Sequence, residues 1–222
     1  MDTRRAALKA EIMQSYDGPF GGWWERLLEE APESLRRIHH MLEAIRATSV
    51  LGSSFQHLVW VAVDSVVTHL YPRGAGIHAR VAIEQGASRR QVIETLEIAT
   101  AASFRGVDAA LSIVLQAATE AGHALPPAPA AAYRARIAEY GTAWPEEAWD
   151  MEGPGLDAKS RALLHLACAA SPALADQDGM RRHAAEALRY GARVEELIET
   201  VQLAQCIATH ALADGIMAMP TE

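Results

Sequence analysis

The sequence contains two segments that match each other at one constant offset. Four residues of the first segment recur 105 positions later without a gap: Gly74, His78, Gly86 and Ala87 correspond to Gly179, His183, Gly191 and Ala192. Such a repeat is typical of folds in which one structural unit occurs twice. We therefore predict a tandem duplicated helical unit with a 105-residue internal repeat.

Each copy has the pattern of three helices, of which the second carries the repeated histidine. The predicted ranges are Ser54 to Leu70 and Asp157 to Ser171 for the first helix, Ala75 to Gln85 and Met180 to Tyr190 for the second, and Arg89 to Ser103 for the third helix of copy one. Gly86 and Gly191 are predicted to end the histidine helices, and Ser88 to cap the helix that follows.

Further segments flank and connect the copies. Helical periodicity runs from Thr3 to Tyr16 and from Pro32 to Ala47, separated by a glycine-rich turn at 17–22. Between the copies we expect a proline-rich linker at 121–131, a helix from Ala132 to Tyr140, and a loop at 144–155. The predicted organisation is residues 1–120 for the N-terminal helices and first repeat, 121–155 for the connection, and 156–222 for the second repeat.

Composition favours an all-α fold and excludes several functions. Half of the 222 residues are hydrophobic but only 6% are aromatic, and Ala, Leu, Glu and Arg dominate. The net charge of -8 without a basic stretch argues against nucleic-acid binding, and the apolar runs are too short to span a membrane. Cys168 and Cys206 lack a redox or metal spacing and are expected to be buried. A cytoplasmic protein is expected.

The repeated motifs resemble a known family. Copy one contains Val61-Ala62-Val63-Asp64-Ser65, Thr68-His69-Leu70-Tyr71, His78 and Glu84-Gln85-Gly86-Ala87-Ser88, and copy two keeps His183, Ala187-Leu188 and Gly191-Ala192. This pattern resembles the signature of two-copy carboxymuconolactone decarboxylase-like proteins. The resemblance covers most of the chain and implies the all-α fold of alkyl hydroperoxidase D-like proteins. The family includes a decarboxylase of aromatic catabolism, thiol-dependent peroxidases and many members of unknown activity.

Two departures from the family pattern narrow the reaction. The peroxidase branch carries a CxxC before its histidine, where this chain has Tyr71 and Gly74 in copy one. Without a thiolate there is no nucleophile to attack a peroxide, so peroxidase activity is not expected. A family glutamate stands 21 residues before the histidine, and here His57 and Ala162 occupy that position.

The predicted first helix of copy one carries a polar stripe. His57, Trp60 and Asp64 fall at i, i+3 and i+7, which places them on one face. Either they form a pocket wall beside His78, or His57 and Asp64 lie at an exposed edge or bond each other. The resemblance places His78 in the active site, where an imidazole can transfer protons near neutral pH. His78, His57 and Asp64 are the predicted catalytic residues.

Other residues are candidates for binding a substrate. His69, Tyr71 and Arg73 are expected in the connection before the His78 helix, with Arg73 as an anchor for a carboxylate. Trp60 and His183 complete the predicted binding residues. The second pocket is expected to be degenerate, because the face equivalent to the polar stripe reads Ala162, His165 and Ala169 in copy two, a list in which only the histidine is polar.

The sequence predicts neither a metal nor a cofactor. There is no H-x-x-x-H pair, cysteine cluster or carboxylate-rich loop, and Gly74-Ala75-Gly76 lacks the third glycine of a dinucleotide fingerprint.

Two functional hypotheses remain open. The first is a cofactor-independent enzyme that uses histidine acid–base chemistry on a small carboxylate or lactone, by decarboxylation or a related opening, isomerisation or cyclisation. The second is a non-catalytic helical assembly protein with a decayed active site. The resemblance also implies a homo-oligomer, with a trimer favoured over a dimer, in which the small residues at 99–102 and 204–208 allow close packing.

Overall fold

The computed structural model describes residues 3–15, 20–123, 128–140, 142 and 152–220. The regular elements in these ranges are helices, so the predicted all-α fold class is confirmed. None of the described helices combines the length and the hydrophobicity needed to cross a membrane. The predicted turn residues 17–19, linker residues 124–127 and loop residues 144–151 lie outside the described ranges.

The chain divides into two compact units that cut across the predicted segments. One unit consists of residues 1–50 and 206–222, and the other of residues 51–205. The first therefore joins the two ends of the chain, while the second contains the repeated histidines and the connection between the copies.

The unit formed by the two ends has its own apolar core. Its helices are α1 (Thr3–Ser15), α2 (Trp23–Glu30), α3 (Pro32–Ala47) and α12 (His210–Ala218), and a short 3-10 turn precedes α12. Leu8, Ile12, Leu27, Leu35 and Ile216 are buried together in this core. The range of α3 agrees with the prediction, and Pro32 fits the first turn because its missing N–H is not needed there. The eight-residue α2 was not predicted.

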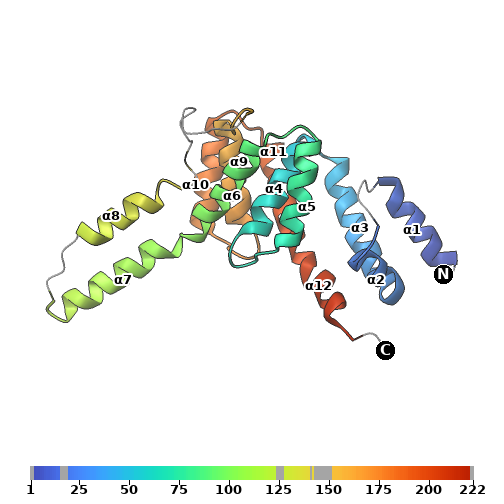
Figure 1. Ribbon diagram of the computed structural model, residues 1–222, viewed down its shortest axis with the longest axis horizontal. Coiled ribbons are helices and arrows are strands. Elements are labelled where there is room, and N and C mark those ends of the chain that lie inside the picture. Colours follow the sequence, from blue (N-terminus) through green and yellow to red (C-terminus); the bar gives the residue numbers. More distant parts are fainter. Residues whose placement is uncertain (1–2, 16–19, 124–127, 141, 143–151, 221–222) are drawn as a thin grey trace. The chain divides into compact units, whose positions relative to one another are not determined.

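The central unit is built around four helices. They are α4 (Ser53–Ser65) and α6 (Arg89–Ser103) from copy one, and α9 (Ala158–Ala170) and α11 (Val194–Gln205) from copy two. α6 and α11 each pack against both α4 and α9. The histidine helices α5 (Pro72–Glu84) and α10 (Gln177–Arg189) pack on α4 and α9 respectively (Figure 1).

Two further helices of this unit connect the copies. α7 (Gly106–Glu120) follows α6, and α8 (Ala128–Ile137) replaces the predicted helix from Ala132 to Tyr140. Figure 1 shows α7 running away from the four central helices. Arg134 of α8 reaches Ser112 of α7 at 3.5 Å.

Backbone features recur in the two copies at the offset of 105. Leu70 and Ala175 both have positive φ angles, of 39° and 47°. Gly86 and Gly191, with φ of 104° and 84°, follow the histidine helices as predicted, since glycine adopts this conformation without steric cost. Ser88 caps α6 as predicted, in a reciprocal capping box with Gln91.

The predicted end of the first helix of copy one was wrong. α4 ends at Ser65 and not at Leu70, although the apolar pattern continues. The left-handed backbone of Leu70 turns the chain, and the N–H of Tyr71 donates to the carbonyl of Asp64 at 2.7 Å. α5 then starts at Pro72, three residues earlier than predicted.

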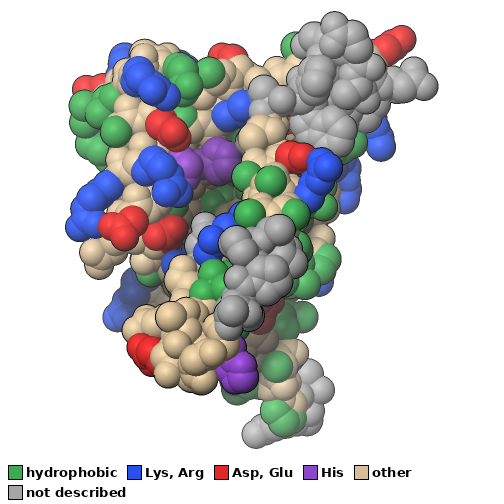
Figure 2. All heavy atoms as spheres, turned by 90° about the vertical axis from the view of Figure 1, so that its left-hand side faces the viewer, with side chains coloured by type: hydrophobic (Ala, Val, Ile, Leu, Met, Phe, Trp, Pro, Cys, Tyr) green, Lys and Arg blue, Asp and Glu red, His purple; other side chains and the backbone are tan. Residues whose placement is uncertain are grey.

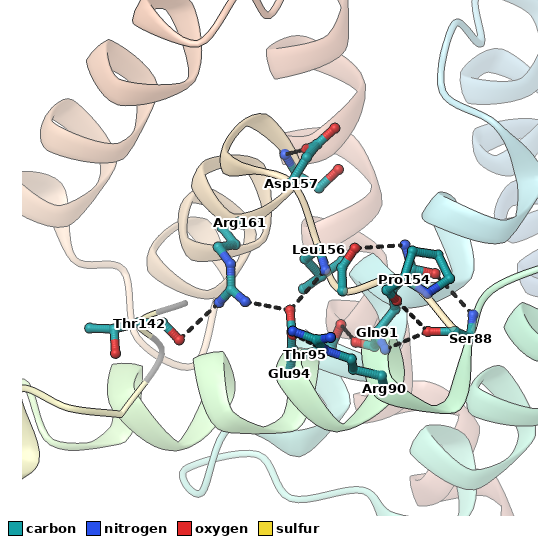
Figure 3. A network of polar contacts seen from close by, with 12 residues as sticks. Ser88, Arg90, Gln91, Glu94, Thr95, Thr142, Pro154, Leu156, Asp157 and Arg161 are labelled. Carbon is teal, nitrogen blue, oxygen red and sulfur yellow. Dashed lines mark hydrogen bonds and ion pairs between the residues drawn. The ribbon is translucent and has the colours of Figure 1, made fainter. Parts of the chain in front are cut away.

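A buried glutamate on α6 holds the start of the other copy. Glu94 is fully buried, and its Oε2 accepts the N–H of Leu156 at 2.8 Å and pairs with Arg161 (Figure 3). Its Oε1 accepts from Nε of Arg90 at 3.0 Å. The carboxylate therefore fixes the residue that leads into α9, and it compensates the buried charge of Arg90.

The equivalent glutamate on α11 makes the reciprocal contact. Glu199, 2% exposed, accepts the N–H of Leu51 at 2.8 Å and the side-chain amide of Gln56 at 2.9 Å. Glu199, Leu51 and Gln56 correspond at the offset of 105 to Glu94, Leu156 and Arg161. The third helix of each copy thus holds the entrance to the first helix of the other.

Replacing Glu94 with glutamine should destabilise the protein strongly. The substitution removes the charge that pairs with Arg90 and Arg161 and turns an amide N–H₂ toward a group that donates a hydrogen bond, which costs about 3–5 kcal/mol in the free energy of unfolding. Urea denaturation of E94Q and of the exposed control E84Q measures the effect. A difference between the two variants of less than about 0.5 kcal/mol would contradict this account of the contact.

Candidate active site

Two histidines from adjacent helices of copy one form a hydrogen-bonded pair. His57 on α4 and His78 on α5 lie with their Nδ1 atoms 2.9 Å apart, and both side chains are partly buried. One ring must donate and the other accept, because two Nδ1–H groups cannot share one hydrogen bond. Of the two interpretations of the polar stripe, the one that places His57 beside His78 agrees with this geometry.

Trp60 forms one side of this pair. It lies one turn after His57 on α4, and its ring centroid is 5.1 Å from that of His57 and 4.8 Å from that of His78. The indole ring thus places an apolar surface beside both imidazole rings. His57, Trp60 and His78 are therefore one cluster, here called the histidine pair site.

Asp64 lies farther along the same face of α4. Seven residues separate it from His57, which is about 10 Å along the helix axis. It is 1% exposed, and its Oδ1 is 3.7 Å from Nε2 of His69. A carboxylate and an imidazole are ligand types that transition metals accept. The polar stripe is thus divided. His57 and Trp60 belong to the histidine pair site, and Asp64 forms a second group with His69 at the end of α4.

Gly74 makes room for this second group. A Cβ added at Gly74 would overlap both the carboxylate of Asp64 and the ring of Tyr71. The Tyr71 ring centroid also lies 6.3 Å from that of His69. Asp64 therefore approaches the first turn of α5, where backbone N–H groups favour a negative charge.

Arg73 is not in a connecting loop as predicted. It lies in the first turn of α5, because that helix starts at Pro72, and its side chain is exposed. Arg80, four residues before the end of the same helix, is exposed as well. Helical backbone fixes Arg73 more firmly than a mobile loop would.

The repeated histidine of copy two has different neighbours. His183 on α10 stacks on His165 of α9, with ring centroids 4.7 Å apart and planes 14° apart. Its Nδ1 lies 2.8 Å from a carboxylate oxygen of Glu186, and its Nε2 lies 3.3 Å from Nη2 of Arg182. Burial lowers the pKa of His183 below its ordinary value, and the Arg182 charge adds to this, while Glu186 and Asp176 act in the opposite direction.

The loss of the polar stripe in copy two does not close the space beside its histidine. A cavity of about 320 Å³ lies beside His165 and His183. The face of the molecule drawn in Figure 2 shows histidine side chains bordered by Lys or Arg side chains. Ala162 of copy two does remove the counterpart of His57, but the space around His183 is not filled.

Both cysteines are buried, as predicted. Burial raises the pKa of the Cys168 thiol to about 12 and that of Cys206 to about 11. Both thiols are therefore protonated near neutral pH, and neither has the thiolate character that peroxide chemistry requires.

Sequence reasoning missed three arginines that line the cavity, Arg105, Arg134 and Arg182. Their positions on α10 and on the connecting segments carry no motif. One signal was available for His165, which stands 105 positions after Trp60 and so marks the same place on the first helix of copy two.

Adding a methyl group at Gly74 should destabilise the protein by about 1–3 kcal/mol, because Asp64 or Tyr71 must move. Gly76 on the same helix is the matched control, since a Cβ there meets nothing within 4 Å. Gly76→Ala should stabilise by up to about 1 kcal/mol through helix propensity. Thermal unfolding of both variants compares them, and equal shifts would refute the packing described for Gly74.

Stability should fall in mild acid because of His183. Its pKa is lower in the folded protein than the ordinary 6.5, so the unfolded chain binds the proton first. The contribution is complete above about pH 6.5 and is lost as the pH falls through the folded-state pKa. Urea titrations between about pH 7 and 5 should show a shallower pH dependence for His183→Gln than for the wild type. The exposed control His123→Gln should match the wild type, and an unchanged slope in His183→Gln would argue against this assignment.

No family model matches the chain, and no curated protein matches its sequence. Among solved structures, the fold is similar to that of a protein from Burkholderia xenovorans provisionally named a gamma-carboxymuconolactone decarboxylase subunit. The TM-score is 0.78 at 19% sequence identity, over 96% of this chain and 94% of the other. The likeness over nearly the full length of both chains shows a shared fold.

Proposed function

We propose that this protein is a cofactor-independent, carboxymuconolactone decarboxylase-like enzyme that uses histidine acid–base chemistry on a small carboxylate or lactone. The observation that carries the proposal is the 2.9 Å hydrogen bond between His57 and His78. The similarity in fold to a protein provisionally named a gamma-carboxymuconolactone decarboxylase subunit supports it. So does the family signature around His78.

The hydrogen bond determines which nitrogen atoms of the two rings carry a proton. With one proton between the two Nδ1 atoms, the ring that donates it has an unprotonated Nε2, which can act as a base, and the other ring has an Nε2–H, which can act as an acid. A second proton makes the pair a cation that can donate, and its loss restores the acceptor. His57 thus takes over a proton-transfer role at the position where the family has a glutamate.

These protonation states of the histidine pair suit a decarboxylation. The bond between the carboxylate carbon and its neighbour breaks, and CO₂ leaves. The electron pair passes into an adjacent carbonyl to form an enolate, and the protonated histidine pair then delivers a proton to the carbon. Trp60 excludes water from one side, so that the proton comes from the pair. The same acid and base serve a lactone opening, an isomerisation or a cyclisation.

The remaining candidate residues have supporting roles in this proposal. Asp64 orients His69 and Tyr71 at the turn before α5, and Arg73 attracts the substrate carboxylate from the first turn of that helix. A homo-oligomer, with a trimer favoured, is part of the proposal because the resemblance to the family implies it. Light scattering measures the oligomeric state.

Replacing either member of the pair should abolish most of the activity. His78→Gln and His57→Gln remove the proton relay and should each lower kcat/KM by about 10²- to 10⁴-fold. Turnover of carboxy-lactones and β-keto acids is followed by CO₂ release and ultraviolet absorbance, with His123→Gln as an exposed control. Circular dichroism verifies that each variant is folded.

Each result separates the two hypotheses from the sequence. Turnover by the wild type and loss in both folded variants supports the enzyme. Turnover that survives both substitutions excludes the histidine pair as the catalytic group. A wild-type protein that neither binds nor converts any member of the panel favours the non-catalytic assembly protein with a decayed active site.

A further inference from the structure

The cavity beside the repeated histidine of copy two lies within the central unit. The residues that line it include neither His57 nor His78 of the histidine pair site. Its wall is formed by the end of α6, the two residues that precede α7, the segment from α8 to Tyr140, the helices α9 and α10, and the connection between α9 and α10. Its volume of about 320 Å³ falls at the lower end of the roughly 300–1,000 Å³ range of small-molecule sites. A small ligand therefore fits, and a dinucleotide does not.

The charges around the cavity are mainly positive. Arg105 precedes α7, Arg134 lies on α8 and Arg182 on α10, so guanidinium groups come from three different parts of the wall. Among the described residues that line the cavity, Asp176 is the one with an acidic side chain. Its Oδ1 already accepts the N–H of Gly179 at 3.1 Å as the cap of α10. The lining thus has an excess of cations over anions.

Polar and apolar groups are arranged around these cations. His165 and His183 form a stacked pair at the wall, and the Glu186 contact at Nδ1 of His183 holds that ring in place. Phe104 and Ile137 contribute apolar surface. A ligand with a short carbon skeleton and anionic ends would satisfy both kinds of surface.

The two copies differ at three positions of this site. Arg182, Asp176 and His165 of copy two stand where copy one has Ile77, Tyr71 and Trp60, a replacement of three apolar or aromatic side chains by charged or titratable ones. Other positions differ in the opposite sense, since Ala169 and Leu174 of the lining stand where copy one has Asp64 and His69. The cavity nevertheless stays open and is lined by three arginines.

We infer that the cavity beside His165 and His183 is a second ligand site, which binds a small dicarboxylate. Arginine presents a planar fork that matches a carboxylate, and guanidinium groups on separate walls bind two carboxylates better than one. Phe104 and Ile137 contact the carbon chain between them. The site does not depend on the proposed catalysis by His57 and His78.

Isothermal titration with adipate tests this site, with hexanoate and adipamide as monoanionic and neutral probes. The wild type should bind adipate, and should bind hexanoate and adipamide at least about tenfold more weakly. Arg182→Gln and Arg134→Gln should each weaken adipate binding by about tenfold or more. Arg181→Gln is the matched control, because Arg181 is the neighbour on α10 that pairs instead with Asp178.

The remaining outcomes decide against the proposal. No adipate binding by the wild type overturns it, and so does equally tight binding of adipamide. His78→Gln should bind adipate as the wild type does. Adipate binding that is lost in His78→Gln but kept in a folded Arg182→Gln would place the ligand at the histidine pair of copy one. Failure of turnover alone leaves this binding result unchanged, so the two proposals are tested separately.

Discussion

The central unit depends on two buried carboxylates that cross between the copies. Glu94 holds the N–H of Leu156, and Glu199 holds the N–H of Leu51. Each bond fixes the entrance to a first helix, and each first helix carries the residues that face a repeated histidine. A charged acceptor of a backbone N–H forms one of the stronger hydrogen bonds in a protein, and burial makes it costly to lose. The position of His57 against His78 therefore depends on the hydrogen bond by which Glu199 of the opposite copy holds the entrance to α4.

The two copies supply a carboxylate to the start of the histidine helix in different ways. In copy two, Asp176 caps α10 and accepts the N–H of Gly179. In copy one that position is Tyr71, and Asp64 reaches the equivalent glycine from α4. The helix terminus needs a negative partner in both cases. The copy that has Asp176 at the cap has Ala169 on its first helix, and the copy that has Asp64 on its first helix has Tyr71 at the cap.

Local signals in the sequence predicted the parts of the fold that local physics determines. Ser88 and Pro32 mark helix starts, and Gly86 and Gly191 mark helix ends, so these boundaries were predicted correctly. The end of α4 was not, because the left-handed conformation at Leu70 carries no glycine to announce it. The sequence shows that Glu94 recurs as Glu199, but only the structure shows that each accepts a backbone N–H from the other copy.

The candidate site was predictable where the repeat and the family signature coincide. His78 meets both conditions, whereas His57 and Trp60 were found from the polar face that they share on one helix, and the structure brings the three together. The cavity of copy two was missed because Arg105 and Arg134 have no counterpart motif and reach it from segments that connect the copies. Long-range packing decides such a site, and single-sequence patterns do not record it.

The crossed carboxylates also say how such a chain can originate. A single copy folded alone would bury its glutamate without the backbone N–H that satisfies it, and would leave the entrance to its first helix without an acceptor. Two identical single-copy chains would each meet the need of the other, as a twofold-symmetric dimer. Fusion of their genes would then preserve an interface that already existed. Each half of this chain thus supplies the buried acceptor that the entrance to the first helix of the other half requires.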